Sequence, residues 1–381
     1  MTKSAVIVNP SKVADLDGHR RELYDALAAA GWPEPLWLPT TPDDPGRGMA
    51  RAAAAAGAEV VLVCGGDGTV MAAAGELAGT DVALALVPSG TGNLLAANLG
   101  IPRSVSGAVA AAVSGDRRRI DVGEVEGAGV FTVMAGMGFD AAMVGEAPDE
   151  AKRRYGVAAY VASGLRNLTR RRISVRIRLH TADDPETADS ANGTPGGAGA
   201  EHVSGPTGAD GATDRAEVDR VTGLRGADDA TDRVAGRAGA ERVTGPTGAD
   251  RAGGRAEADR ATGRAGKPKW LRREAQAVLV ANVGRLQGGI PLLADAEPDD
   301  GLLDVAILTP SHLSDWIRLA GGVMLHRGGA AHGLETFRVR AVEIVADREE
   351  PCEIDGDVVA PARRLAARVR PGALIVCVPQ A

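Results

Sequence analysis

Residues 60–70, with the sequence VVLVCGGDGTV, place one carboxylate inside a glycine-rich turn. The apolar run Val60–Cys64 predicts a buried strand, and an alanine-rich helix is expected over Val70–Leu77. A turn of this kind leaves backbone N–H groups free at a helix N-terminus, where a phosphate can bind. Asp67 would repel phosphates unless it holds a metal ion, orients a water or accepts a proton. The alternative is a tight turn in which Asp67 only caps the helix.

A second turn of similar composition, Ser89–Asn93, follows the next apolar run, Val82–Val87. Like residues 65–69, it offers backbone donors and a hydroxyl, so the two turns together could bind a polyphosphate without a lysine. No GxxxxGK[ST] motif is present. Asn9 follows the apolar run Ala5–Val8 and could add an amide contact.

Two acidic motifs lie far downstream. Residues 297–304, EPDDGLLD, pair adjacent carboxylates with a glycine, which suits a hard cation bound by carboxylate and carbonyl oxygens. The alternative is a simple Asp-Gly turn. Residues 352–357, CEIDGD, would place Glu353, Asp355 and Asp357 on one face of a strand, and the alternative is again a hairpin turn.

A GxGxxA match at Gly136–Ala141 is a weak dinucleotide-binding signal. It lies outside the series of alternating strands and helices that such a fingerprint requires. We therefore do not favour a dinucleotide-binding reading.

The elements that must position these residues fall into two groups. Over residues 1–120, short apolar strands alternate with helices, which predicts an α/β domain with a mostly parallel sheet. Asn9, Thr40, Asp67 and Thr91 each follow a predicted strand. Because ligands of open α/β sheets bind at the carboxyl ends of the strands, these residues are expected to share one site.

Residues 121–381 show a different pattern, in which several predicted strands alternate apolar and polar side chains. This pattern indicates a mainly antiparallel β domain, of the sandwich type. Residues 181–266 interrupt it with a near-repeat rich in Gly, Ala, Thr, Asp and Arg. Such a tract cannot bury enough apolar surface to offset its ordering entropy, so we expect a disordered insertion between two strands, with a partner-binding loop as the alternative.

Composition excludes several classes of function. The formal charge of −7 gives no overall attraction to nucleic acid, and no apolar run approaches the length of a membrane-spanning helix. The three cysteines show no paired spacing, which fits a reducing cytoplasm better than a disulfide or thiolate-metal framework.

Taken together and in order, six motifs resemble the bacterial soluble diacylglycerol kinases, which include the YegS-type lipid kinases and are related to sphingosine kinases. The resemblance covers nearly all of the chain outside the insertion. It implies a phosphofructokinase-like N-terminal α/β domain and a C-terminal antiparallel β-sandwich, with the active site between them. The six motifs are Asn9-Pro10, Gly65–Thr69, Pro88–Asn93, Gly136–Ala141, Asp299–Asp304 and Ile354–Asp357.

The resemblance also implies roles for individual residues. Asp355 or Asp357 would be the general base, and Asp67 would act with the magnesium ion of the nucleotide or share the base role. Asp300 would hold a structural Mg²⁺ with the carbonyls of Glu297 and Leu302. Residues implied or expected to bind ATP are Asn9, Thr40, Thr41, Gly65, Gly66, Asp67, Gly68, Thr69, Val70, Met71, Ser89, Gly90, Thr91, Gly92 and Asn93.

The implied function is an ATP- and Mg²⁺-dependent lipid kinase of phospholipid metabolism that phosphorylates a lipid hydroxyl, with diacylglycerol giving phosphatidic acid. One alternative is an enzyme like NAD kinase, which shares the glycine-rich motif. The other is a lipid- or nucleotide-binding regulator without catalysis, because Met71, Ala72 and Leu94 depart from the family pattern.

A lipid substrate implies contact with a membrane. Basic residues from Lys152 to Arg172 flank the apolar helical stretch Val157–Leu168, a pattern typical of segments that lie on an anionic surface. We therefore expect a cytoplasmic, peripherally membrane-associated protein that takes a lipid alcohol as substrate and binds no nucleic acid. The oligomeric state is open, and a homodimer is one possibility.

Overall fold

The computed structural model describes residues 2–138, 172–181, 270–285, 291–293, 295–310 and 333–380, with 312, 314, 315, 318 and 321. Several expected features lie outside these residues. They are the helix Gly156–Leu168 with the basic segment around it, most of the helix Leu313–Leu325, the end of the GxGxxA match, and nearly all of the insertion at 181–266. Among the described residues, no helix is long and apolar enough to cross a membrane.

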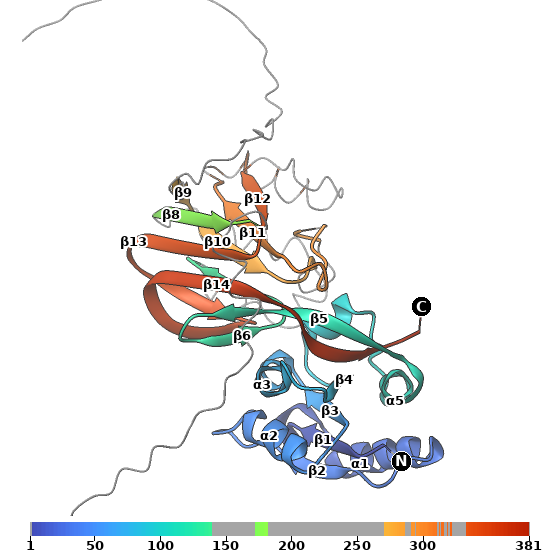
Figure 1. The fold of residues 1–381 in the computed structure, drawn as a ribbon. Coiled ribbons are helices and arrows are strands. Elements are labelled where there is room, and N and C mark those ends of the chain that lie inside the picture. The colour runs from blue at the N-terminus through green and yellow to red at the C-terminus, as the bar shows by residue number, and fades with distance from the viewer. Residues whose placement is uncertain are drawn as a thin grey trace, which may run out of the picture. The chain divides into compact units, whose positions relative to one another are not determined.

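Four parallel strands form the sheet of the N-terminal part, as the sequence predicted (Figure 1). Their order across the sheet is β4-β3-β1-β2. All residues of β1 and β3 are buried, as expected for strands with helices on both faces. The strands are β1 (Ser4–Val8), β2 (Leu36–Pro39), β3 (Val60–Gly65) and β4 (Ala83–Pro88).

Helices cover both faces of this sheet because successive strand residues point to opposite sides. Val6 and Val8 pack in one apolar cluster with α1 (Leu16–Ala29) and α5 (Val105–Ser114). Ala5 and Ile7 pack in another with α2 (Arg47–Ala55) and α3 (Asp67–Leu77). A short helix, α4 (Leu94–Asn98), follows β4.

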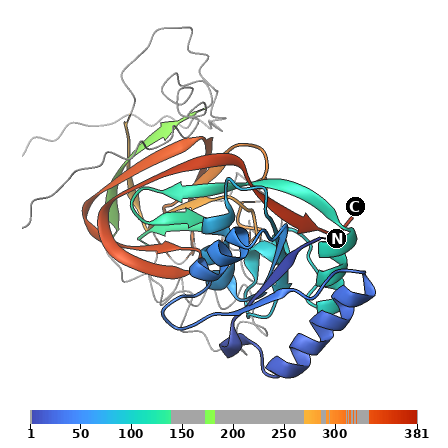
Figure 2. The same cartoon turned by 60° about the horizontal axis from the view of Figure 1, so that its bottom comes forward.

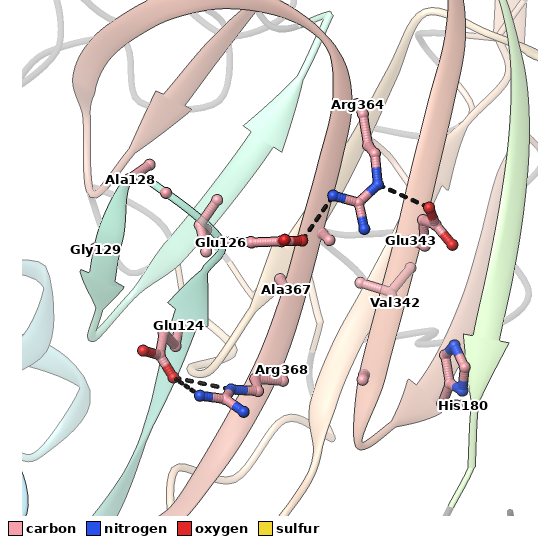
Figure 3. Close-up of a pocket in the computed structure, with 14 residues that line it drawn as sticks. Glu124, Glu126, Ala128, Gly129, His180, Val342, Glu343, Arg364, Ala367 and Arg368 are labelled. Carbon is pink, nitrogen blue, oxygen red and sulfur yellow. Dashed lines mark hydrogen bonds and ion pairs between the residues drawn. The ribbon is translucent and has the colours of Figure 1, made fainter. Parts of the chain in front are cut away.

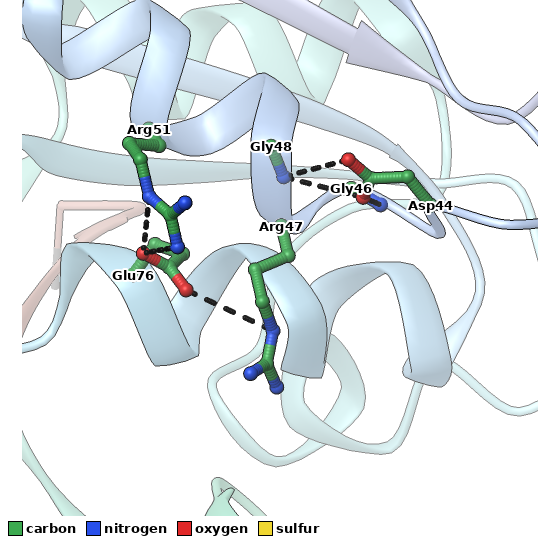
Figure 4. A network of polar contacts seen from close by, with 6 residues as sticks. All are labelled: Asp44, Gly46, Arg47, Gly48, Arg51 and Glu76. Atoms are coloured by element: carbon green, nitrogen blue, oxygen red, sulfur yellow. Dashed lines mark hydrogen bonds and ion pairs between the residues drawn. The ribbon is translucent and has the colours of Figure 1, made fainter. Parts of the chain in front are cut away.

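Polar contacts fix the start of α2 and tie it to α3 (Figure 4). The Asp44 carboxylate accepts hydrogen bonds from the N–H groups of Gly46, at 3.0 Å, and Gly48, at 2.9 Å. On the exposed side, Glu76 of α3 pairs with Arg51 at 3.1 Å and with Arg47 at 3.7 Å. These contacts hold the two helices together next to the glycine-rich turn that precedes α3.

The second part of the chain is built from antiparallel strands, which confirms the predicted antiparallel β domain. Residues 181–269, which contain the insertion at 181–266, connect β8 to β9, two neighbouring strands that pair from Ile173↔Ala275 to Arg178↔Trp270. The strands are β5 (Asp116–Val125), β6 (Gly129–Phe131), β7 (Met134–Met137), β8 (Ile173–His180), β9 (Trp270–Ala275), β10 (Ala277–Ala281), β11 (Leu303–Leu308), β12 (Leu334–Val339), β13 (Ala341–Ile354) and β14 (Asp357–Val378).

Strand β14 joins the two parts of the fold (Figures 1 and 2). Its first half pairs with β13, and it pairs with β5 along much of its length. Near its end, Ile375 and Val376 pair in parallel with Ala83 and Leu84 of β4. The hydrogen-bonded sheet therefore continues from the parallel strands into the antiparallel ones.

The acidic motif at 352–357 is a hairpin turn, and the expectation of three carboxylates on one strand face is wrong. Ile354 ends β13 and pairs directly with Asp357, the first residue of β14. Asp355 and Gly356 form the two-residue loop, with φ angles of 48° and 89°. Two positive φ angles suit the twist of a tight hairpin, and an Asp-Gly pair tolerates them.

Glu353 is a buried carboxyl group on β13, with 3% of its surface exposed. It pairs with Gly136 of β7 and Val358 of β14. Its Oε2 atom has no hydrogen-bond partner among the described residues. Burial, and after it the charge of Asp355, raises the pKa of Glu353 to about 7.

We expect Glu353→Gln to stabilise the protein at about pH 8 and to change little at about pH 5. The neutral acid is favoured in the folded state, so its contribution to stability is lost as pH rises through the folded pKa of about 7. A shift from the ordinary value of 4.5 corresponds to on the order of 3 kcal/mol. Urea unfolding at the two pH values measures the difference.

Glu349→Gln is the matched control, because Glu349 is an exposed glutamate of the same strand. It should leave stability unchanged at both pH values. An equal gain for Glu353→Gln at both pH values would show that ionisation of Glu353 is not the cause.

Candidate functional site

The carboxyl ends of the parallel strands bring together the residues that the sequence placed there. Asn9 follows β1, and its Nδ2 donates to the Thr69 hydroxyl in the first turn of α3 at 3.2 Å. Thr40 is buried and donates its N–H to Val8 at 2.8 Å. Thr41 is exposed, and its hydroxyl accepts from the Asp44 N–H at 3.1 Å. Asn9 and Thr69 therefore lie in one site, while Thr41 contributes to the turn before α2.

The two glycine-rich turns pack directly against each other. The N–H groups of Ser89 and Gly90 both donate to the carbonyl of Gly65, at 3.2 and 3.1 Å. A Cβ atom on Gly90 would lie 2.6 Å from the Cα of Gly66, a distance that real Cβ atoms do not reach. Glycine is therefore required at position 90 by the close approach of the two backbones.

Asn93 closes the second turn in a left-handed conformation, with φ of 49°. Its side-chain oxygen accepts from the N–H of Gly90 at 3.1 Å, and its Nδ2 donates to the carbonyl of the same residue. The Arg103 guanidinium donates to that carbonyl at 2.9 Å. Arg103 is a part of this site that sequence reasoning missed, since it lies outside every motif.

Asp67 links the two turns. Its Oδ2 accepts from the N–H of Asn93 at 2.9 Å, and its Oδ1 accepts from the N–H of Leu94 at 2.6 Å. Burial raises the pKa of Asp67, and these backbone donors oppose the rise. The carboxylate thus caps the neighbouring helix α4 across the site, a role that the sequence did not indicate.

Backbone donors are left for a ligand in both turns, because the N–H groups of Thr91 and Gly92 in the second turn have no protein partner in the described structure. Ser89, Gly90, Asn93 and Leu94 already donate their N–H groups within the protein. In the described structure, the N–H groups of Gly68 and Thr69, in the first turn of α3, have no protein partner. They point from the N-terminal end of a helix, where an anion is stabilised.

Asp355 is fully committed to the protein interior. It is 5% exposed, and its Oδ2 accepts from the N–H and the hydroxyl of Thr132, at 2.8 and 3.0 Å. Its Oδ1 accepts from the N–H groups of Val133 and Met134, both at 2.9 Å. Burial raises the pKa of Asp355 to about 6, against the effect of these four donors.

Asp357 is the exposed carboxylate of the same hairpin. A Cβ atom on Gly68 would lie 3.3 Å from its Oδ2, so the carboxylate lies against the first turn of α3. Burial of part of the side chain raises the pKa of Asp357, and the negative charge of Asp67 raises it further. The structure therefore places Asp357 beside Gly68, a residue whose N–H is free.

The carboxylates of the acidic turn at 297–302 pair with arginines. Asp300 forms an ion pair with Arg338 and accepts from the N–H of Leu302 at 2.9 Å. Asp299 accepts two hydrogen bonds from Arg118, at 2.7 and 2.8 Å. No group of three acidic, His or Cys side chains that could hold a metal occurs in the described ranges. The structural Mg²⁺ expected at Asp300 with the carbonyls of Glu297 and Leu302 needs only one carboxylate, and this site stays a prediction.

Asp121 and Asn282 connect this turn to Thr132, which binds Asp355 of the hairpin. Both residues were missed in the sequence. The Asp121 carboxylate accepts from the N–H groups of Gly301, at 2.6 Å, and Gly372, at 2.7 Å. Asn282 donates its Nδ2 to the carbonyls of Asp121, at 2.8 Å, and Thr132, at 3.2 Å. The one sequence signal is that each is a polar residue within or just after an apolar run.

A separate pocket of about 560 Å³ lies on the face formed by β5, β13 and β14 (Figure 3). Its charged side chains pair with each other: Arg364 lies between Glu126, at 2.6 Å, and Glu343, at 2.7 Å. Arg368 pairs with Glu124 at 2.8 Å. The charged side chains drawn are thus already paired with each other, and the His180 imidazole is drawn without a partner.

Comparisons with known proteins agree with this geometry. Residues 3–125 match the family model "Diacylglycerol kinase catalytic domain". Residues 265–378 match the model "YegS C-terminal NAD kinase beta sandwich-like domain". The two matches lie on either side of the segment that contains the insertion, and together they cover more than half of the chain.

Curated relatives are similar over part of their length. A probable lipid kinase YegS from Salmonella newport is 32% identical over 153 residues, which are 38% of this chain and 51% of that protein. A probable lipid kinase YegS from Escherichia coli is 35% identical over 113 residues, 29% of this chain and 38% of that protein. The chain thus spans about half or less of the relatives that it matches.

Solved structures share the fold over nearly the whole chain. A putative diacylglycerol kinase from Bacillus anthracis superposes with a TM-score of 0.64, covering 99% of this chain and 97% of that one, at 18% identity. That identity supports the fold alone, and the two domain matches identify the family. The chain belongs to the lipid kinase family that joins a diacylglycerol kinase catalytic domain to a YegS-type C-terminal domain.

Proposed function

We propose that the chain transfers the γ-phosphoryl group of Mg-ATP to the hydroxyl group of a lipid alcohol, and that diacylglycerol is the acceptor, giving phosphatidic acid. The observation that carries the proposal is the position of Asp357. A carboxylate with a raised pKa lies against the first turn of a helix in which the N–H groups of Gly68 and Thr69 are free. Phosphoryl transfer needs this combination of anion binding and a nearby proton acceptor.

Phosphate binding falls to the first turn of α3. The N–H groups of Gly68 and Thr69 supply donors, and the Asn9–Thr69 hydrogen bond orients the Thr69 hydroxyl. The magnesium ion carried by the nucleotide would neutralise charge on the phosphates. Asp67 accepts hydrogen bonds from Asn93 and Leu94, which holds the second turn against the first.

Proton removal falls to Asp357. Its carboxylate is exposed and accepts no hydrogen bond from another described residue, so its lone pairs are available to an incoming hydroxyl. The carboxylate of Asp355 is buried, and both of its oxygens already accept hydrogen bonds from protein donors. We therefore assign the base role to Asp357 and a supporting role to Asp355.

The departures from the family pattern do not favour a catalytically inactive regulator. Leu94 contributes its backbone N–H to Asp67, and this contact does not depend on the side chain. Met71 packs against the apolar cluster of the β domain. The hydrogen bonds described for the two turns are therefore kept with Met71 and Leu94 at these positions, in line with the lipid kinase proposal.

The test of this function is ATP consumption with mixed micelles that contain a panel of lipid alcohols, with NAD in a separate reaction. We expect turnover with diacylglycerol and none with NAD. The NAD reaction is included because the C-terminal model is described as NAD kinase-like. Turnover with NAD alone would replace the lipid kinase proposal.

The proposal includes work at a membrane surface, from which the lipid must be drawn. Membrane association is tested by measuring ATP consumption on vesicles with and without anionic lipid, at low and at high salt. Faster turnover on anionic vesicles, lost at high salt, is the expected result.

Asp357→Asn should lower kcat by on the order of 10²- to 10⁴-fold without changing the unfolding midpoint, because it removes a base and no internal contact. Asp355→Asn should lower the unfolding midpoint as well as activity, because an amide group would face four hydrogen-bond donors. Steady-state kinetics and urea unfolding of both variants measure this.

The opposite result would assign the general base to Asp355 instead of Asp357. If Asp357→Asn keeps its turnover while Asp355→Asn folds normally and is inactive, Asp355 is the proton acceptor.

Gly90→Ala should weaken ATP binding by at least about tenfold, because the added Cβ would push apart the two turns at the Gly66 backbone. Gly75→Ala is the matched control within α3: its Cβ would lie 3.4 Å from Val130, an acceptable contact. Calorimetric titration with ATP measures both. Equal affinity in the two variants would show that the packing of the turns does not shape the nucleotide site.

A further inference from the structure

The position of Asp357 depends on a turn that is anchored from outside the hairpin. The loop residues Asp355 and Gly356 both have positive φ angles. Asp355 donates its N–H to the carbonyl of Met134 at 2.8 Å, and its carboxylate accepts from three consecutive residues of the segment 132–134, which leads from β6 into β7. The hairpin tip is therefore held by that segment.

Thr132 is the one side-chain donor among the four groups that bind Asp355. Its N–H and its hydroxyl both donate to Oδ2, whereas Val133 and Met134 contribute backbone N–H groups. Thr132 is 1% exposed, so water does not replace its hydroxyl. A substitution at Thr132 can therefore remove one donor and leave the backbone donors in place.

Asn282 fixes Thr132 in turn. Its Nδ2 donates to the Thr132 carbonyl, and its own N–H donates to the carbonyl of Val133 at 2.8 Å. Through the Asp121 carbonyl and carboxylate, the same chain of buried hydrogen bonds reaches Gly301 in the acidic turn. The anchor of the hairpin thus extends across the β domain.

The hydroxyl of Thr132 also favours the ionised form of the Asp355 carboxyl group. A hydrogen bond to a carboxylate favours its ionised form, and burial favours the neutral one. Asp355 has a pKa of about 6 with all four donors present. Without the hydroxyl its pKa would rise, so that a larger fraction would be neutral near pH 7 and would bind the backbone donors less strongly.

We propose that Thr132 is a positioning residue for phosphoryl transfer, which acts through Asp355 to hold Asp357 against Gly68, with Asn282 as its support. This inference rests on the proposed function, and no contact of Thr132 with a substrate is involved. It assigns the polar groups of residues 132 and 282 a role in turnover, although neither residue belongs to the phosphate-binding turn.

The test compares Thr132→Val, which removes the hydroxyl at nearly constant shape, with Thr132→Ser, which keeps it. For Thr132→Val we expect kcat to fall by on the order of tenfold, with KM for ATP and for dioctanoylglycerol within about twofold of the wild type. The acidic limb of its kcat–pH profile should move to higher pH. Thr132→Ser should restore both kcat and the profile.

Other titrating groups near the hairpin are shared by the two variants. Glu353 on β13, Asp357 on β14 and Asp67 on α3 remain unchanged in both, so the Val–Ser difference reports on Asp355. A lower unfolding midpoint for Thr132→Val with unchanged kcat and pH profile would overturn the proposal, and so would identical kinetics for Val and Ser.

Hydrogen exchange separates this inference from the function on which it rests. Thr132→Val should speed amide exchange at the hairpin tip, residues 352–360, and leave β1–β4 unchanged, while Thr132→Ser should match the wild type. If the wild type phosphorylates no lipid, the proposed function fails. Unchanged exchange at the tip in Thr132→Val overturns the anchoring role whatever the activity.

Discussion

Hydrogen bonds from the backbone N–H groups of one segment to the carboxylate of another hold the site together. Asp67 binds Asn93 and Leu94, Asp355 binds three consecutive residues from Thr132, and Asp121 binds Gly301 and Gly372. A buried carboxylate is costly unless it is hydrogen-bonded, and charge-assisted bonds are stronger than neutral ones. Each acid therefore fixes a loop that has little regular structure of its own.

This use of carboxylates separates structural acids from the acid that is free to react. The acidic candidates from the sequence are, in chain order, Asp67, Asp300, Asp355 and Asp357, of which Asp300 was expected to hold a metal ion and the others to act in catalysis. In the structure, the oxygens of the first three accept protein donors, from backbone amides or from Arg338. Asp357 alone of these four keeps an exposed carboxylate beside a helix N-terminus. Availability of lone pairs, rather than residue type, distinguishes it.

The sequence was sufficient for the architecture and for the strand ends that form the site. Strand and helix periods predicted the parallel sheet, and Asn9, Asp67 and Ser89 follow its strands as expected. The partners of the acids could not be predicted, because they are backbone N–H groups, which every residue except proline has. The pairing of Asp300 with Arg338 joins β12 to a turn 38 residues away, and no local pattern reports such a contact.

Strand β14 has a consequence for the order in which the protein is made. Its residues Ile375 and Val376 pair with Ala83 and Leu84 at the edge of the parallel sheet, about three quarters of the chain length away. During synthesis, β4 therefore leaves the ribosome long before its neighbour exists and presents an open strand edge, which is a template for aggregation. Pairing at such sequence separation is also slow. The edge of the N-terminal sheet is thus covered in part by β14, so a ribosome that stalls within β14 would release an N-terminal domain with an unprotected edge.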